Sequence, residues 1–381
     1  MPGIRALALC IAVAVPGIFI GASAAAQSVV TGYVFTRGAL LAPREIDAHN
    51  LTRINYAFAN IDGGRMVLGV PVDAQNLAAL TALRRDNPSL TVLVSVGGWL
   101  GSKRFSDVSL TAQSRQIFVQ SAVDFLKLHD LDGLDVDWEY PGMAGAGNPF
   151  RPEDKQNFTL LLKDLREGMD QATRKTGKRL YLTIAAGAFD EFLAHADMGQ
   201  VSRYVDTVNL MTYDSYEAGS DAITGNHAPL FEDPADPKKA SADAMMQAFE
   251  KAGVPGKKIL LGVPFYGRMW GEVADRNHGL FQPGKVIKGA YSPYSAITGT
   301  MLGQGFTRYW DTAAAVPYLY NPEKHIFVSY EDPESLAGKC RYVLSHQLGG
   351  VMFWEYSGDP SGTLLQTIHN SLNGTAGTLG K

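Results

Sequence analysis

Cysteine is nearly absent from this chain, which has two, Cys10 and Cys340, among 381 residues. Cys10 lies in a segment that reads as a removable leader, so Cys340 is expected to be the one cysteine of the mature chain. No internal disulfide can then form. Cys340 falls in a predicted helix four residues before Leu344, and we interpret it as a small core residue.

Runs of basic residues are also missing. The chain has 34 Lys and Arg against 38 Asp and Glu, a net charge of −4, so neither nucleic acid nor an anionic membrane is indicated as a partner. The substrate is expected to be uncharged. There is no Gly-x-Ser-x-Gly motif, no paired cysteine spacing and no His-x-x-x-His pair among eight histidines. We therefore expect no metal and no cofactor.

The chain has no apolar run of the roughly 20 residues that a membrane span needs. The stretch 6–20 comes nearest, but a proline and a glycine interrupt it. Arg5 precedes this stretch and three alanines, 24–26, follow it, so residues 1–26 read as a secretory signal cleaved near Ala26. We expect a secreted monomer, extracellular or periplasmic, with no membrane association after cleavage.

What the chain does have is a row of acids within residues 131–141, Leu-Asp-Gly-Leu-Asp-Val-Asp-Trp-Glu-Tyr-Pro. As a β-strand of period two, it sends Asp135, Asp137 and Glu139 to one face and apolar residues to the other. Successive acids would stand about 7 Å apart and repel one another. The row is then expected to titrate as an interacting group that retains a proton, and a retained proton is what a general acid needs.

The residues alone leave two other interpretations of this row open. In a solvated edge strand the outward acids would be ordinary and the apolar residues would form the core. Carboxylates at alternate positions could also hold Mg²⁺ or Ca²⁺, although the nearby loop lacks supporting Asn, Asp or carbonyl-rich spacing. Trp138, Tyr140 and Pro141 favour acid/base chemistry, because they end the strand and place aromatic residues beside Glu139.

The spacing Asp132-x-x-Asp135-x-Asp137-x-Glu139, followed by Tyr140-Pro141, resembles the signature of glycoside hydrolase family 18, the chitinases. This resemblance covers nearly all of the mature chain and implies a (β/α)₈ TIM barrel. The order of β-rich and helical stretches agrees, because their alternation is typical of parallel strands with helical crossovers.

Eight strands and four longer helices are predicted from the residue pattern. The strands are expected at residues 29–35, 54–59, 91–96, 133–139, 179–185, 207–213, 259–265 and 350–354, and the helices at 73–85, 111–129, 152–175 and 241–252. Periodicity alone would equally fit an open doubly wound sheet. The count of eight favours a closed barrel, and the resemblance supports the same choice.

About 65 residues separate the seventh predicted strand from a helix near residue 333, far more than a βα loop usually takes. The many aromatic residues of 269–331 indicate a folded insertion between strands 7 and 8. It resembles the α+β insertion of one chitinase subfamily, which forms a wall of the substrate groove. We therefore assign 27–268 and 332–372 to the catalytic barrel, 269–331 to the insertion and 373–381 to a flexible tail.

Barrel enzymes build their sites at the carboxyl ends of the strands, and further family motifs stand at those ends. They are Ser-Val-Gly-Gly-Trp ending at Trp99, Met-Thr-Tyr-Asp with Tyr213 and Asp214, Phe-Tyr-Gly-Arg with Tyr266 and Arg268, and Trp354 on strand eight. By resemblance, Tyr213 and Asp214 join the catalytic set, while Trp99, Tyr266, Arg268 and Trp354 would bind substrate.

The resemblance implies a substrate-assisted retaining mechanism. Glu139 would protonate the glycosidic oxygen while the sugar's own 2-acetamido oxygen attacks the anomeric carbon. Asp137 would hold the acetamido N–H, and Asp135 would share a proton with Asp137. Tyr213 would hydrogen-bond the acetamido oxygen and Asp214 would help position the group. Glu139 would then act as base on the incoming water.

Such a mechanism needs an N-acetyl group on the sugar at the cleaved position, so chitin or chitooligosaccharides are the expected substrates. Tyr33, Trp99 and Trp354 are candidate stacking platforms, with Trp354 as the floor under the cleaved sugar. Many relatives carry a Trp shortly after the Met-x-Tyr-Asp motif. Residues 215–221 contain none, so Tyr216 is the candidate platform for the leaving sugar.

Two other functions stay open. A non-catalytic chitin-binding lectin could use the same barrel, but such proteins usually lack the acid, which is present here as Glu139. An endo-β-N-acetylglucosaminidase acting on glycoprotein glycans is chemically closer, although the aromatic insertion favours a long chitin-like groove.

Overall fold

The computed structural model describes residues 28–42 and 45–374. The expected signal at 1–26 and Cys10 lie outside these residues, as do positions 375–381 of the predicted tail. Asn373 is the last residue of a helix rather than the first of a tail. Within the part of the chain described, no helix is long and apolar enough to cross a membrane.

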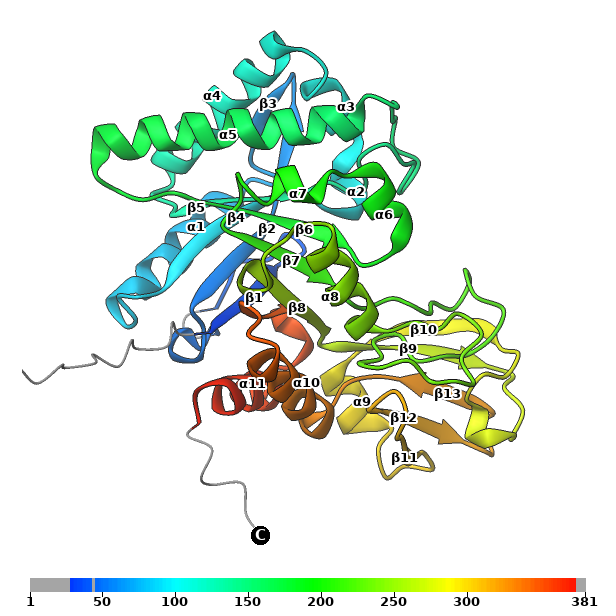
Figure 1. Ribbon diagram of the computed structural model, residues 1–381. Helices are drawn as coiled ribbons and strands as arrows, with labels where there is room; N and C mark the ends of the chain where they lie inside the picture. The colour runs from blue at the N-terminus through cyan, green and yellow to red at the C-terminus, as the bar shows by residue number, and fades with distance from the viewer. Residues whose placement is uncertain (1–27, 43–44, 375–381) are drawn as a thin grey trace, which may run out of the picture.

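Eight parallel strands close into a barrel (Figure 1). The order runs β1-β14-β8-β7-β6-β5-β4-β2, and β2 pairs again with β1. This closure excludes the open sheet and confirms the predicted (β/α)₈ barrel. The strands are β1 (Val29–Phe35), β2 (Arg53–Asp62), β4 (Thr91–Gly97), β5 (Gly133–Asp137), β6 (Tyr181–Gly187), β7 (Thr207–Met211), β8 (Ile259–Pro264) and β14 (Gly350–Trp354). A short β3 (Arg65–Val67) extends β2 as a hairpin.

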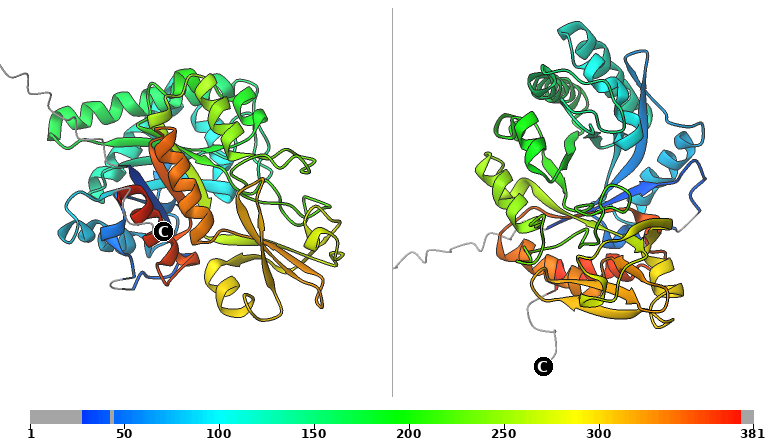
Figure 2. Two further views of the ribbon diagram at one scale, coloured as in Figure 1. Left: turned by 60° about the horizontal axis from the view of Figure 1, so that its bottom comes forward. Right: turned by 90° about the vertical axis from the view of Figure 1, so that its right-hand side faces the viewer.

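Helices surround the strands (Figure 2). They are α1 (Asp73–Ala82), α2 (Gly98–Gly101), α3 (Phe105–Val108), α4 (Ala112–Leu128), α5 (Asp154–Thr176), α6 (Asp190–His195), α7 (Met198–Val201), α8 (Ala242–Lys251), α10 (Pro333–Ser345) and α11 (Thr363–Asn373). The predicted helices are confirmed to within a few residues. Thr111 is the N-cap of α4 and accepts a hydrogen bond from the Ser114 backbone N–H, which satisfies a donor that the helix leaves unpaired. Cys340 lies buried in α10, as expected.

A second sheet of five antiparallel strands lies beside the barrel (Figure 1). Its order is β10-β9-β13-β12-β11, and its elements are β9 (Tyr266–Gly271), β10 (Lys285–Pro293), α9 (Tyr294–Thr300), β11 (Thr307–Asp311), β12 (Val316–Asn321) and β13 (Ile326–Ser329). It occupies the region for which an α+β insertion is predicted. The sheet begins three residues before 269, because β9 follows β8 after a single residue. Trp270, Tyr320 and Phe327 are buried in its own core.

Candidate active site

The acidic row lies in the middle of the barrel. Strand β5 pairs with β4 on one side and β6 on the other, and all five of its residues are buried. The interpretation as a solvated edge strand is therefore wrong. Within the described residues, no group of three or more His, Cys, Asp or Glu is placed to hold a metal ion.

Glu139 lies two residues beyond the strand on which it was expected. Strand β4 ends at Gly97, the register partner of Asp137, and the pairing with β6 ends at Val136, so the residues after Asp137 are paired with neither neighbouring strand. The Glu139 N–H instead donates to Ser102 Oγ at 2.9 Å, and Asn148 Nδ2 donates to the Glu139 carbonyl at 2.8 Å. Side chains thus hold the backbone of Glu139 where the sheet no longer does.

The approach of β4 to Asp137 depends on glycine. Gly97 has φ +111°, and a Cβ there would stand 2.1 Å from the Asp137 carbonyl oxygen. Any side chain at this position would push the two strand ends apart, which explains a glycine at the predicted Ser-Val-Gly-Gly-Trp motif.

Asp135 is buried and fully hydrogen-bonded. Its Oδ2 accepts from Tyr33 Oη at 2.9 Å and from Ser95 Oγ at 2.8 Å. Its Oδ1 accepts from Thr183 Oγ1 and from Asn209 Nδ2, the latter at 3.0 Å. Burial raises the pKa of Asp135, while three of these hydrogen bonds act to lower it. Four donors around one carboxylate stabilise its anionic form.

Asp137 lies directly above Asp135 on the same face, and it is also buried. Its Oδ1 has no hydrogen-bond partner within the described residues. Burial, followed by the charges of Glu139 and Asp135, raises the pKa of Asp137 well above its ordinary value. The raised pKa of Asp137 and that of Glu139 both favour the protonated forms, which is the direction that the predicted retained proton requires. No hydrogen bond joins Asp135 to Asp137 in the described arrangement, so proton sharing between them stays a prediction.

Glu139 has a raised pKa of about 7. Burial is the main cause, the Asp214 charge adds to it, and a hydrogen bond from Tyr140 opposes it. Tyr140 is the aromatic neighbour of Glu139. Trp138 points to the other side of the strand and stacks on Phe105, with ring centroids 5.3 Å apart, so the aromatic residue beside Glu139 is Tyr140 and not Trp138.

Asp214 and Arg268 form a bidentate ion pair next to this acid. Arg268 Nε and Nη2 each donate to one Asp214 oxygen at 2.8 Å. Burial alone would raise the pKa of Asp214, but His227 and Arg268 hold it below its ordinary range. His227 is buried 3.5 Å from Asp214, and burial lowers the pKa of His227 despite that carboxylate. Asp214 is therefore a permanent anion at neutral pH.

A single cavity of about 1340 Å³ brings most of the predicted residues together. Asp137, Glu139, Tyr213, Asp214, Tyr266, Arg268, Trp99, Trp354 and Tyr33 all line it. Asp135 does not, because it lies beneath Asp137 and reaches the cavity only through its hydrogen-bond partners. The Tyr213 ring meets Tyr266 edge to face at 6.3 Å. The ends of β4, β5, β7, β8 and β14, together with Tyr33 of β1, thus supply one site, as the barrel architecture predicts.

The three aromatic side chains that were predicted to stack on sugars differ in their solvent exposure. Trp354 stacks on Phe58 and Phe35, with centroids 5.6 and 5.7 Å away, and its ring is held as a floor. Trp99 is 51% exposed, so its face is free for a sugar. Tyr33 is only 2% exposed and donates its hydroxyl to Asp135. This geometry fits a hydrogen-bond partner of the acid and argues against Tyr33 as a stacking platform.

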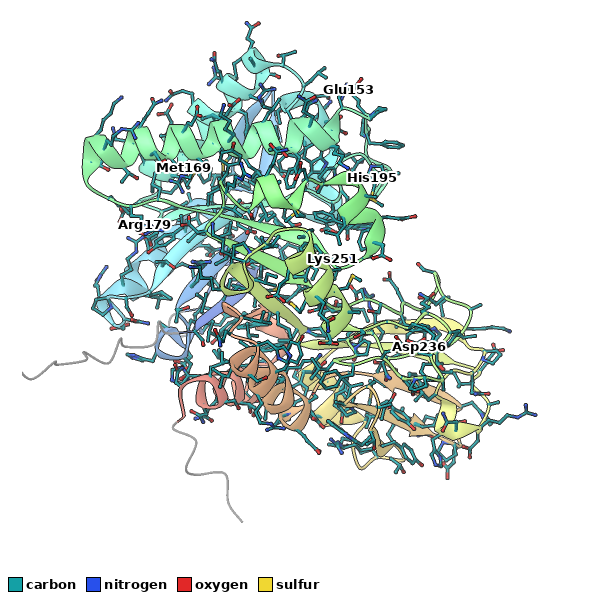
Figure 3. All side chains as sticks on the ribbon, viewed as in Figure 1. Glu153, Met169, Arg179, His195, Asp236 and Lys251 are labelled. Atoms are coloured by element: carbon teal, nitrogen blue, oxygen red, sulfur yellow. The ribbon has the colours of Figure 1, made fainter. Side chains whose placement is uncertain are left out.

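Tyr216 does not line the cavity. Its side chain is fully buried among residues of the second sheet, and its hydroxyl donates to Asp236, which lies in the loops beside that sheet (Figure 3). The idea that Tyr216 carries the leaving sugar is therefore wrong. The ring points inward because the second sheet surrounds it with apolar side chains, and the segment after β7 supplies the Asp236 carboxylate for its hydroxyl.

Replacing Tyr216 by Leu is expected to lower the free energy of unfolding by about 3 kcal/mol, because it removes a buried ring and leaves Asp236 short of a donor. Urea titration measures this loss, with Tyr216→Phe, which keeps the ring, as the milder control. The KM for chitooligosaccharides should stay unchanged. A raised KM at unaltered stability would restore Tyr216 as a substrate contact.

Sequence reasoning missed two residues that line the cavity and three that lie beneath it. Phe35 and Phe58 support Trp354, and Ser95, Thr183 and Asn209 bind Asp135. Phe35 ends the first predicted strand, so the rule that sites form at strand ends could have found it. Ser95, Thr183 and Asn209 are polar residues inside strands that are otherwise largely apolar. A polar residue at such a position could have indicated a buried polar partner.

The fold and the site together define a class: a TIM-barrel enzyme with glycosidase-type carboxylates at the carboxyl ends of its strands. The family model for glycosyl hydrolases family 18 matches residues 29–359. The chain therefore belongs to glycoside hydrolase family 18, as its motifs predict.

Similar proteins carry related names. Chitinase A1 of Niallia circulans is 39% identical over 396 residues, covering 88% of this chain and 56% of the relative, so the chain spans little more than half of that protein. Chitotriosidase-1 of Mus musculus is 32% identical over 328 residues, covering 82% of this chain and 68% of the relative. The structure of a family 18 N-acetylglucosaminidase from Paenibacillus barengoltzii superposes with a TM-score of 0.83 at 41% identity, covering 91% of this chain and all of that chain.

Proposed function

We propose that this protein is a chitinase that hydrolyses β-1,4 bonds between N-acetylglucosamine units of chitin or chitooligosaccharides with retention of configuration. The observation that carries the proposal is the pair Asp137 and Glu139, held side by side in one cavity over the Trp354 floor. The names of two relatives, Chitinase A1 and Chitotriosidase-1, support it.

Glu139 acts first as general acid. Its raised pKa keeps a proton on the side chain near neutral pH, and that proton passes to the glycosidic oxygen as the bond to the leaving sugar breaks. Glu139, now a carboxylate, later takes a proton from the water that attacks the anomeric carbon. This second attack restores the starting configuration.

Asp137 supports the attack by the substrate. The sugar's acetamido oxygen forms a bond to the anomeric carbon from the side opposite the leaving group, which gives a cyclic oxazolinium ion. Asp137 Oδ1, which is free of partners among the described residues, accepts the acetamido N–H and stabilises the positive charge that develops. Asp135 lies beneath and is proposed to share the proton of Asp137 as the positive charge develops, so that Asp137 can carry negative charge toward the ion.

Tyr213 and Asp214 complete the site. The Tyr213 hydroxyl is proposed to donate to the acetamido oxygen and so to aim it at the anomeric carbon. Burial raises the pKa of Tyr213 well above its ordinary value, and nearby carboxylates add to this, so the hydroxyl keeps the proton that it donates. Arg268 holds Asp214 in place, and Trp354 stacks on the apolar face of the sugar.

The test is digestion of a chitin tetramer by the mature protein, with products read by NMR immediately after cleavage. Rapid release of β-anomeric N-acetylglucosamine products supports the retaining mechanism, whereas initial α-anomers contradict it. Tight binding without cleavage would indicate the lectin. Cleavage of the chitobiose core of a glycoprotein glycan, with chitin oligomers left intact, would indicate the endo-β-N-acetylglucosaminidase.

The same digestion separates a second candidate activity. The Paenibacillus structure, matched over its full length, is described as an N-acetylglucosaminidase, and an enzyme of that kind would release monomers as the first product. Dimers as the first product favour a chitinase that cuts within the chain. Secretion is likewise a proposal, supported by the leader-like residues 1–26 and tested by the N-terminal mass of protein recovered from outside the cytoplasm.

A further inference from the structure

A buried cation inside the barrel has no part in the mechanism above. Arg53 is the first residue of β2, and it is only 5% exposed. Its Nη1 donates to Thr207 Oγ1 at 2.8 Å, and its Nε has no hydrogen-bond partner among the described residues. Burying a cation without a paired carboxylate is costly. A negative charge elsewhere in the interior is therefore needed to stabilise it.

The head of Arg53 lies one layer of side chains below Asp135. Thr207, the acceptor for Arg53, begins β7 and pairs in register with Thr183 of β6. Thr183 in turn donates to Asp135 Oδ1. Asn209 follows Thr207 on the same face of β7 and donates to the same oxygen at 3.0 Å. Because same-face neighbours on a strand are about 7 Å apart, the guanidinium lies at about that distance from the Asp135 carboxylate.

An aromatic contact gives the same position for the guanidinium. Arg53 Cζ lies 5.4 Å from the centroid of the Tyr181 ring. Tyr181 stands two residues before Thr183 on the same face of β6, so this contact is also one layer below Asp135. The ring face and the Thr207 hydroxyl orient the guanidinium, but they do not neutralise its charge.

One other carboxylate lies near Arg53. Burial lowers the pKa of Arg53, while the charges of Asp206 and then Asp135 raise it. Asp206, just before β7, already pairs with two other cations, Arg166 and Arg179. Asp135 has no cation bound to it, because all four of its partners are neutral donors. Asp135 is therefore the carboxylate that gains most from the charge of Arg53.

The remaining groups around this interior leave the charge of Arg53 in place. The titratable groups that face Arg53 or the acidic row are Tyr33 of β1, Asp137 and Glu139 above Asp135, Tyr181 of β6, Asp206 before β7 and Tyr213 after it. Strands β4, β8 and β14 contribute Ser95, Leu260 and Met352, none of which is charged. Arg53 is thus the one cation among these groups.

Two carboxyl groups, Asp135 and Asp137, therefore share the barrel interior with one cation. Repulsion between the carboxylates disfavours the ionisation of both. The charge of Arg53 favours the ionisation of one. Burial raises the pKa of Asp135, three hydrogen bonds lower it, and the charge of Arg53 lowers it further.

We propose that Arg53 is a positioning residue for the reaction, whose charge keeps one negative charge on the Asp135 and Asp137 pair and so sets the lowest pH at which the enzyme works. This inference rests on the proposed function, because that mechanism needs a carboxylate to stabilise the oxazolinium ion while Glu139 is still protonated. The two aspartates titrate as a unit. Their ionisation then produces the fall in kcat/KM at low pH, and that of Glu139 produces the fall at high pH.

The test is the pH profile of kcat/KM for a chitin tetramer in the native protein, Arg53→Gln and Arg53→Lys. Without the cation, ionisation of the pair is less favourable, so the low-pH limb of Arg53→Gln should move to higher pH. We expect a shift of about one to two units, the effect of a unit charge roughly 7 Å away at an effective dielectric constant of about 20. The high-pH limb should move less, because Glu139 lies further from Arg53. Arg53→Lys keeps the charge and should return the low-pH limb most of the way to its native position.

Two further variants separate the charge from the packing of the side chain. Arg53→Met replaces the buried cation by an apolar chain, a change that folded proteins often tolerate, and should move the low-pH limb as far as Arg53→Gln. Arg115→Gln is the matched control. Arg115 is also buried, at 8% exposed, but it pairs with Asp164 in the helical layer. This variant should lose stability and keep both limbs, whose midpoints do not depend on the fraction of protein that folds.

Three outcomes would overturn the proposal. They are a low-pH limb that stays in place in both Arg53→Gln and Arg53→Met, a limb that Arg53→Lys moves as far as they do, and a limb that Arg115→Gln moves equally. All three can occur in an enzyme that cleaves the tetramer with retention, so they leave the chitinase proposal standing. Failure of the native protein to hydrolyse the tetramer at any pH would instead reject the chitinase proposal, and this inference with it.

Discussion

Replacing Glu139 by Gln is expected to lower kcat about 10²- to 10⁴-fold, the usual contribution of a general acid. Glutamine preserves the size of the side chain but has no acidic proton for the glycosidic oxygen. Single-turnover hydrolysis of a chitin tetramer measures the loss, and the Kd for the oligomer should change little. Glu153→Gln, at the exposed start of α5 (Figure 3), is the control that should retain native activity. Native kcat in Glu139→Gln would mean that another group is the acid.

The pH profile tests the same assignment independently. With a pKa of about 7, Glu139 holds its proton below that pH and loses it above. The kcat/KM should therefore fall as pH rises through about 7, approaching tenfold per unit. Stability has the same sign: the folded chain binds this proton in a window where the unfolded chain has lost it, so the free energy of unfolding should fall as pH rises toward 7. In Glu139→Gln the free energy of unfolding should depend less steeply on pH in this window, because the proton of Glu139 no longer contributes.

Replacing Asp137 by Asn is expected to lower kcat about 10²- to 10³-fold, comparable to removing one preorganised group from a developing charge. The amide can still accept a hydrogen bond from the acetamido N–H, but it cannot stabilise positive charge on the oxazolinium ion. Steady-state kinetics on the tetramer should show the loss mainly in kcat. An inhibitor that mimics the cyclic ion should lose affinity by a similar factor.

Asp132→Asn provides a matched control for this change. It makes the same carboxylate-to-amide replacement at the start of the same strand, where Asp132 pairs with Arg84 and Lys178 and lies outside the cavity. Asp132→Asn should lower the midpoint of denaturation, because two ion pairs are weakened, while kcat stays near the native value. A kcat loss in Asp132→Asn as large as that in Asp137→Asn would show that strand integrity, and not the charge of Asp137, controls the rate.

Local periodicity explains why much of the site could be predicted. The alternation of β5 depends only on the two-residue repeat of a strand, so Asp135 and Asp137 share a face in any extended conformation. The cavity residues Tyr213 and Asp214 were found through the resemblance of Met-Thr-Tyr-Asp to a family motif. The position of that motif at a strand end agrees with the rule that barrel enzymes build their sites at the carboxyl ends of the strands.

The sequence-based predictions for two tyrosines were wrong because each side chain could lie either in the cavity or in a buried environment. Tyr216 was expected in the groove, but it points toward Asp236 and the core of the second sheet, which is built by residues 54 to 111 positions further along the chain. Tyr33 was expected to stack on a sugar, but its hydroxyl donates a hydrogen bond to Asp135, which lies 102 residues further along the chain. Nothing in the neighbouring sequence marks either choice.

The sequence by itself therefore determined the barrel, the order of its strands along the chain and the presence of Asp135 and Asp137 on one side of β5, because these follow from local periodicity, segment count and family motifs. The tertiary structure decided what each acid does. Burial raised the pKa of Asp137 and Glu139, four donors from β1, β4, β6 and β7 gathered around Asp135, and Arg268 from β9 kept Asp214 ionised. Desolvation and hydrogen bonding depend on groups brought together from distant parts of the chain. Only the folded structure therefore determines which of the acids favours the protonated form.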